Sequence, residues 1–282
     1  MSRVAIVTSK GVDDPDNPHL FAALADLDLS ADLVVWDDDG VAWADYDLAV
    51  IRSTWDYSAR RAEFLAWARD RSRLENPLSI IEYSSDKHYL ADLEARGLGV
   101  IPSRFCAVGE TPDFHFGGRV DFVVKPCVGA GSRQVARYRP EETDVATRHV
   151  AALHDEGRDV LLQPYVHSVD TLGERGVIFI DGRFSHAMTK GAMLNVAAQD
   201  RDFLFRRRQM SLAVAEAEAV LYATEVLSTL GVSDLLYARV DLVATLAGWL
   251  VMELELVEPA LYLAYDDAAA AKLAAAIARR LG

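Results

Sequence analysis

Residues 237–259 read YARVDLVATLAGWLVMELELVEP. Polar and apolar residues alternate in both halves of this stretch, which is typical of two half-buried strands. Gly248 ends a short connector, so we expect a hairpin that sets Asp241 beside Glu253 and Glu255. Carboxylates this close raise one another's pKa unless a cation neutralises them. Oxygen ligands on rigid strands suit Mg²⁺, so the hairpin is a candidate metal site.

A second interpretation of the same hairpin is an ordinary amphipathic pair of strands with its acids in water. Arg239 shares a face with Asp241. An arginine next to a metal site can stabilise a developing oxyanion, which favours the catalytic interpretation.

Composition indicates the broad class of the protein. The chain has 282 residues, of which 51% are hydrophobic, and this length predicts two or three lobes. Its net charge of −14 and the lack of a basic stripe argue against nucleic-acid binding. The run Arg206, Arg207, Arg208 is expected to be a solvated face. Two cysteines fit a reducing compartment. Without a leader or a long apolar segment, we expect a cytoplasmic protein that does not enter membranes; the oligomeric state stays open.

The first part of the chain alternates strands and helices. Strands are predicted at 4–8, 32–36 and 48–51, with a helix at about 17–27, and short links between them favour a parallel sheet. Ligands of such sheets bind at the carboxyl ends of the strands, so the segment following residue 51 is a candidate binding rim.

A loop of small residues follows the predicted strand 121–125. Residues 126–132 read PCVGAGS, and backbone amides in such a loop can approach phosphate oxygens. Lys125 at its entrance favours this function over a plain turn. Cys127 is expected to be a small buried side chain, since no histidine is predicted nearby to activate it.

The later part of the chain predicts a strand at 159–166, a hairpin at 176–190 turning at Asp181-Gly182, and amphipathic helices at 211–230 and beyond Asp266-Asp267. Residues 191–209 have no clear period. They are interpreted as a lid or substrate loop, with disorder as the alternative.

The order of four motifs along the chain indicates a family. They are VVKP at 123–126 with its glycine loop, LLQPYV at 161–166 with an acid seven residues after Gln163, Arg-x-Asp at 239–241 and Glu-x-Glu at 253–255. Together they resemble the ATP-grasp superfamily of carboxylate ligases over essentially the whole chain. The resemblance implies an α/β fold with an N-terminal domain at 1–84, a central lobe at 85–166 and a C-terminal lobe with the metal site at 167–282.

The resemblance also implies roles for individual residues and the use of ATP with Mg²⁺, or Mn²⁺ in its place. Arg239 and Lys190 would be catalytic, and Asp241, Glu253 and Glu255 would bind the metal. The nucleotide would be bound by Lys87, Lys125, Gly129, Gly131, Ser132, Gln163, Tyr165, Val166 and Asp170. ATP would phosphorylate a carboxylate, and a nitrogen would then attack the acylphosphate.

Two further phrases, RSTWDY at 52–57 and MELELVEPALYL at 252–263, are most similar to a bacterial subgroup that includes O-ureido-serine cyclo-ligases of D-cycloserine biosynthesis. This implies a small amino-acid substrate that is cyclised by its own nitrogen, while residues 191–209 depart from the subgroup. Alternatives are an intermolecular amino-acid or dipeptide ligase and a non-catalytic nucleotide-binding module. The rim is expected to bind the substrate, Arg52 its carboxylate and Asp56 its ammonium, through Arg52, Ser53, Thr54, Trp55 and Asp56.

Overall fold

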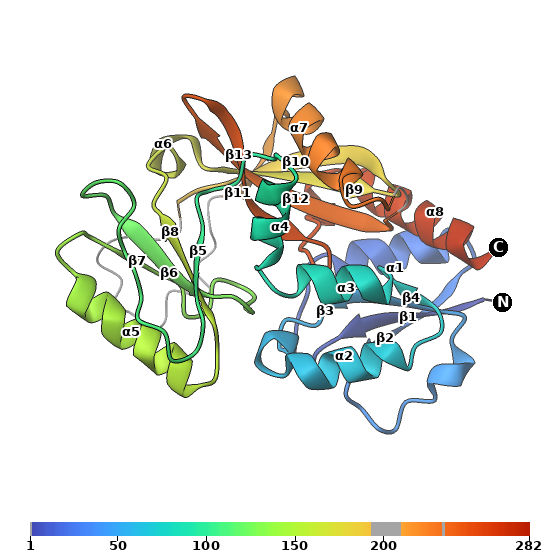
Figure 1. Cartoon of the computed structure of the whole chain (residues 1–282). Coiled ribbons are helices and arrows are strands. Elements are labelled where there is room, and N and C mark those ends of the chain that lie inside the picture. Colours follow the sequence, from blue (N-terminus) through green and yellow to red (C-terminus); the bar gives the residue numbers. More distant parts are fainter. Residues whose placement is uncertain (1, 193–209, 233–234) are drawn as a thin grey trace.

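The computed structural model describes residues 2–192, 210–232 and 235–282, which form three β-sheets with helices packed on their faces (Figure 1). The α/β class predicted from the sequence is confirmed. Residues 193–209, which make up most of the predicted lid and include the arginine run, lie outside the described residues. No described helix has both the length and the apolar character needed to cross a lipid bilayer.

The N-terminal sheet is parallel, with strand order β2-β1-β3-β4. Alternate residues of β1 face opposite helical layers: Val4 and Ile6 pack with α1 and α8, while Ala5 and Val7 pack with α2 and α3. The elements are β1 (Arg3–Thr8), α1 (Asn17–Ala25), β2 (Ser30–Val35), β3 (Leu48–Ser53), α2 (Arg61–Arg69), β4 (Leu74–Glu75), α3 (Leu78–Ser84) and α8 (Ala269–Leu281).

The central sheet is antiparallel, with strand order β5-β8-β6-β7. Ala146, Val150 and Leu153 lie on one stripe of α5 and bury themselves against Phe122 and Leu162 of the sheet. The elements are β5 (Arg104–Cys106), β6 (Phe122–Pro126), β7 (Ala136–Tyr138), α5 (Thr143–Asp155) and β8 (Val160–Pro164).

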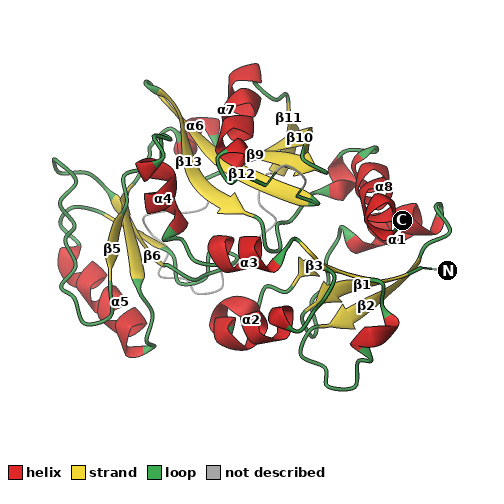
Figure 2. Cartoon of the chain, turned by 45° about the vertical axis from the view of Figure 1, so that its right-hand side comes forward, coloured by secondary structure: helices red, strands yellow, loops and turns green. Residues whose placement is uncertain are grey.

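The C-terminal sheet is also antiparallel, with strand order β11-β10-β9-β12-β13. One face is covered by α4 and α7, so α4, which follows the N-terminal sheet in sequence, packs on the C-terminal one (Figure 2). The elements are α4 (Tyr89–Ala95), α6 (Val169–Leu172), β9 (Glu174–Ile180), β10 (Arg183–Lys190), β11 (Met210–Ala213), α7 (Ala217–Ser228), β12 (Tyr237–Thr245) and β13 (Gly248–Glu255).

The predicted helix at 211–230 is wrong in its first turn. Ser211 and Leu212 belong to β11, where Leu212 pairs with Met188 of β10, and the helix begins only at Ala217. Strand pairing with a sequence-distant partner overrides the local helical pattern at this point.

Asn76 fastens the N-terminal lobe to the base of the β12–β13 hairpin. Its fully buried side chain donates hydrogen bonds to the carbonyl oxygens of Tyr237 (2.9 Å) and Leu256 (2.8 Å), and accepts one from the Leu236 N–H (2.9 Å). One amide thus satisfies three buried backbone groups, which fixes the hairpin relative to the parallel sheet.

Candidate active site

A cleft of about 340 Å³ is lined by residues from all three sheets. Its walls come from the loop after β3, the glycine loop after β6, the end of β8 and the β12–β13 hairpin. Thirteen of the residues predicted to form the site line it: Trp55, Lys87, Lys125, Gly129, Gly131, Ser132, Gln163, Tyr165, Val166, Lys190, Arg239, Glu253 and Glu255.

Two lysines and the glycine loop form one side of the cleft. Lys125 lies on β6, and Lys87 lies just before α4 with its Nζ 2.8 Å from Glu253 Oε1 and 3.1 Å from the Gly129 carbonyl oxygen. Burial lowers the pKa of Lys125, although Glu253 opposes the change. Gly131 has φ +64°, a conformation that favours glycine, so the loop can turn its backbone toward the cleft.

The hairpin carries the three predicted metal ligands opposite the lysines. Asp241 pairs with Glu253 and Arg239 pairs with Glu255 across β12 and β13, so the hairpin sets Asp241 beside the two glutamates as the sequence predicts. One carboxylate oxygen from each of Asp241, Glu253 and Glu255 lies within 4.8 Å of the other two.

The electrostatics of these three carboxylates are unequal. Burial alone would raise the pKa of Glu253, but Lys87 and Lys125 lower it to about 2. Burial, with the nearby Asp241 and Glu253, raises the pKa of Glu255 to about 7 despite Arg239. A divalent cation would fit this set of three oxygen donors and would favour the charged form of Glu255.

Lys190 and Arg239 both pair with the carboxylate of Asp241. Lys190 Nζ lies 2.5 Å from Asp241 Oδ2 and 3.1 Å from Glu174 Oε2, and these acids raise its pKa against the effect of burial. Arg239 Nε donates to Asp241 Oδ1 at 2.9 Å, and its Nη2 pairs with Glu255. Both cations are thus charged and oriented before any substrate binds.

Comparison with known proteins identifies the family. A model of the N-terminal domain of the D-cycloserine synthetase DcsG matches residues 4–78. The chain is also 39% identical over 285 residues to the cycloserine biosynthesis protein DcsG of Streptomyces lavendulae, an alignment that covers 95% of this chain and 94% of that protein. The chain belongs to the DcsG family.

Solved structures agree with this assignment of the DcsG-family enzyme. The crystal structure of the D-cycloserine synthetase DcsG matches with a TM-score of 0.88 and 34% identity, covering 100% of both chains. The D-alanine–D-alanine ligase of Bacillus anthracis complexed with ATP matches with a TM-score of 0.70 and 16% identity over 100% of this chain and 97% of that one, which shows a shared fold. The enzyme is an ATP-grasp ligase that uses ATP to form C–N bonds.

Most of the predicted substrate rim does not reach the cleft of the DcsG-family enzyme. Arg52 is fully buried: its Nη1 donates to the Pro259 carbonyl oxygen at 3.1 Å and its Nη2 lies 3.5 Å from Asp16 Oδ2. Ser53 and Thr54 are also fully buried. The structure therefore does not bring these three residues to the cleft, and their contact with substrate stays a prediction.

Asp56 does not reach the cleft either. Its carboxylate accepts hydrogen bonds from Ser9, from Trp36 Nε1 at 3.0 Å and from Arg60 Nη2 at 2.6 Å, and these donors leave its pKa lowered although burial acts in the opposite direction. The structure pairs the charge of Asp56 with Arg60, so it gives no support to the prediction that Asp56 binds an ammonium. Trp55 alone of the five rim residues lines the cleft.

Residues 163–166, which are expected to bind the nucleotide, line the cleft. Two of their polar groups already form hydrogen bonds within the protein. Gln163 Nε2 donates to Ser103 Oγ at 2.9 Å, and the Tyr165 N–H donates to the Asp121 carbonyl oxygen at 2.7 Å. Asp170 is not among the lining residues; it accepts a hydrogen bond from the Tyr165 hydroxyl at 2.6 Å. The nucleotide contact expected of Asp170 thus has no support from this geometry.

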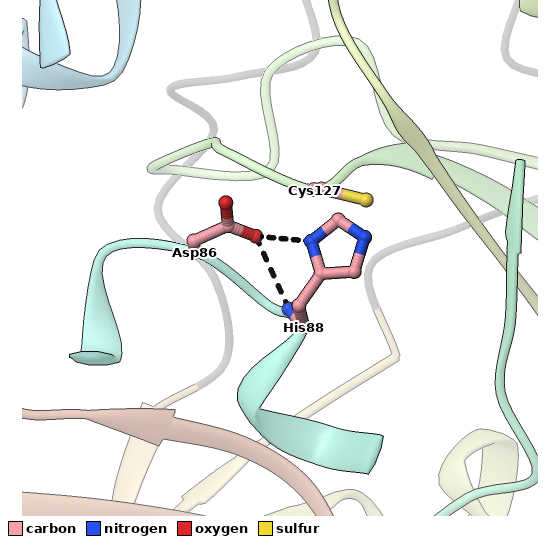
Figure 3. Close-up of side chains that lie close together, drawn as sticks. All are labelled: Asp86, His88 and Cys127. Carbon is pink, nitrogen blue, oxygen red and sulfur yellow. Dashed lines mark hydrogen bonds and ion pairs between the residues drawn. The ribbon is translucent and has the colours of Figure 1, made fainter. Parts of the chain in front are cut away.

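Cys127 has a histidine beside it, contrary to the sequence-based expectation (Figure 3). Asp86 Oδ1 lies 2.6 Å from His88 Nδ1, and one ligand atom from each of Asp86, His88 and Cys127 lies within 4.8 Å of the others. The contact is invisible in the sequence because β6 meets the start of α4 only in the folded chain. Burial and the nearby Asp86 raise the pKa of Cys127, so the thiol is a poor nucleophile.

Several polar residues that line the cleft were not predicted as site residues, among them Glu174, Glu258 and Tyr262. Glu174 begins β9 and pairs with Lys190, a contact set by the β9–β10 register. Glu258 follows the Glu-x-Glu pair by three residues, a spacing that offered a signal in the sequence.

Proposed function

We propose that this enzyme phosphorylates the carboxylate of an O-ureido-serine-like amino acid with ATP and closes a ring by attack of a nitrogen in the same molecule. The observation that carries the proposal is one cleft in which the lysines and glycine loop face the acids of the β12–β13 hairpin. The similarity to DcsG, whose name concerns D-cycloserine, supplies the substrate class.

In this proposal the nucleotide phosphates lie between Lys87, Lys125 and the glycine loop, and the base lies at 163–166. The support is positional: both ammonium groups are buried at one cleft and the loop backbone is open to it. Buried cations bind polyphosphate more strongly than solvated ones, because the local dielectric is low.

We assign Mg²⁺ to Asp241, Glu253 and Glu255. The three oxygens within 4.8 Å and the pKa of Glu255, raised to about 7 by burial and by the other two acids, both support a divalent cation here. When bound, such a cation neutralises charge on the transferred phosphoryl group and shapes the site around it.

The protein's own groups then act in sequence. A substrate carboxylate oxygen attacks the γ-phosphorus and ADP leaves, while Lys190 offsets charge on the phosphoryl oxygens. The substrate nitrogen next attacks the acylphosphate carbonyl, Arg239 stabilises the oxyanion, and inorganic phosphate leaves as the ring closes. Holding both reacting ends of one molecule in a single cleft gives a large effective concentration, which favours cyclisation over attack by a second molecule.

The test measures phosphate release and product mass with Mg²⁺-ATP and O-ureido-D-serine. Ring closure is expected to need no second amine. A product that forms only when a second amino acid is added would overturn the proposal in favour of an intermolecular ligase.

A further inference from the structure

Glu258 lines the cleft and has no protein partner among the described residues. It is half-buried, and in residues 2–192, 210–232 and 235–282 no donor forms a hydrogen bond or ion pair with its carboxylate. A carboxylate in this position is costly unless a cation neutralises it.

The nearby cations of the protein are committed to other acids. Lys87 pairs with Glu253, and Arg239 pairs with Asp241 and Glu255. Burial and then Glu255 raise the pKa of Glu258 well above the usual value, and Lys87 and Arg239 only partly oppose this. Glu258 therefore has no cation of its own among the described residues, and a cationic ligand beside it would favour its charged form.

The metal ion does not account for Glu258. The described acids whose oxygens converge within 4.8 Å are Asp241, Glu253 and Glu255, and Glu258 is outside that group. A free carboxylate also repels nucleotide phosphates. The remaining cation that an amino-acid ligase meets in each turnover is the ammonium group of its substrate.

We propose that Glu258 binds the α-ammonium of the amino acid whose carboxylate is activated beside Arg239. The proposal rests on the amino-acid ligase function proposed above. In an α-amino acid the ammonium is one carbon from the carboxylate. Glu258 and Arg239 line the same cleft, and Arg239 Nη1 donates a hydrogen bond to the carbonyl oxygen of Ala260, two residues after Glu258. Opposite charges on the enzyme thus match the two ends of a zwitterion.

This contact also explains which nitrogen reacts. An amine paired with a carboxylate stays protonated, and a protonated amine has no lone pair to attack the acylphosphate. Glu258 would thereby hold the α-nitrogen as a spectator and leave the side-chain nitrogen as the nucleophile.

The experiment compares O-ureido-D-serine with its des-amino analogue, in which hydrogen replaces the ammonium, as substrates of wild type, Glu258→Gln and Glu258→Asp. We expect the wild type to prefer the amino acid by about 10- to 100-fold in kcat/KM, the range for a charged hydrogen bond. Glu258→Gln should bring this preference close to one, and Glu258→Asp should retain part of it. The exposed Glu94→Gln on α4 is the matched control and should keep the full preference.

The dissociation constant for ADP reports on folding of the variants and should not change. Equal loss of activity with both compounds, or an undiminished preference in Glu258→Gln, would overturn the proposal. A shifted Mg²⁺ requirement with the preference intact would make Glu258 a metal ligand and would also overturn it. If the wild type cyclises neither compound but releases phosphate with other amino acids, the proposed cyclisation fails. The role of Glu258 is then tested by comparing those amino acids with their des-amino analogues in the same three proteins.

Discussion

Replacement of Glu253 by glutamine tests the electrostatic centre of the site. The amide keeps the shape of the side chain but removes the charge 2.8 Å from Lys87. Lys87 and Lys125 depress the folded-state pKa of Glu253 from 4.5 to about 2, against the effect of burial. A depressed carboxylate pKa stabilises the fold above pH 4.5, and this stability is lost as the pH falls toward 2. The shift corresponds to about 3 kcal/mol of stability at neutral pH.

We therefore expect Glu253→Gln to lower the free energy of unfolding by about 2–3 kcal/mol at pH 7, measured by urea denaturation. A typical domain has enough stability to remain folded after such a loss. Phosphate release should fall at least about 100-fold, because the variant loses a proposed metal ligand as well as a partner of Lys87. Titration with Mg²⁺ should restore only part of the rate.

The control is Glu218→Gln, on the exposed face of α7, which should match the wild type in both assays. Turnover of Glu253→Gln at the wild-type rate across the Mg²⁺ titration would remove Glu253 from the metal site. An unchanged unfolding free energy would refute the electrostatic reasoning, since it would mean that the two lysines do not depend on this carboxylate.

Four further predictions follow from the same contacts. Lys125→Ala should weaken ADP binding at least about tenfold by calorimetry, and an unchanged dissociation constant would contradict its phosphate role. Asn76→Ala should cost about 3–5 kcal/mol in urea denaturation, because three buried backbone groups lose their partner; a cost below about 1 kcal/mol would show that water replaces the amide. Asp181→Asn should reduce the loss of stability on acidification below pH 4, since two arginines of α8 depress the pKa of Asp181 although burial acts the other way; identical pH profiles would contradict this pairing. Cys127 should react with a thiol reagent at pH 7 only after unfolding, and rapid labelling of the folded enzyme would contradict its burial and raised pKa.

Local patterns were enough to predict the β12–β13 hairpin. The alternation of polar and apolar residues predicted which side chains share a face of each strand, and the connector at Gly248 predicted the turn. Together these predicted Asp241 beside Glu253 and Glu255. The glycine loop and the strand carrying Lys125 were also local signals. The order of these motifs, rather than any one of them, indicated the family.

The burial of most of the substrate rim away from the cleft could not be predicted, because its environment is set by distant residues. Arg52 is buried by the carbonyl of Pro259, 207 positions away, and by Asp16 from the segment before α1. A polar residue at the end of a parallel strand usually faces a ligand. Arg52 instead connects two distant segments through its contacts with Pro259 and Asp16. The proximity of His88 to Cys127 likewise depends on how two lobes meet.

The pairing of α1 with α8 has a consequence for synthesis of the enzyme. Val4 and Ile6 are covered on one side by helices from opposite ends of the sequence, and Figure 1 shows these helices side by side. While the ribosome is still translating, the first sheet lacks half of that cover, so the nascent chain carries an exposed apolar face until α8 emerges. Chaperone occupancy and protease sensitivity of stalled chains should drop sharply once α8 is released.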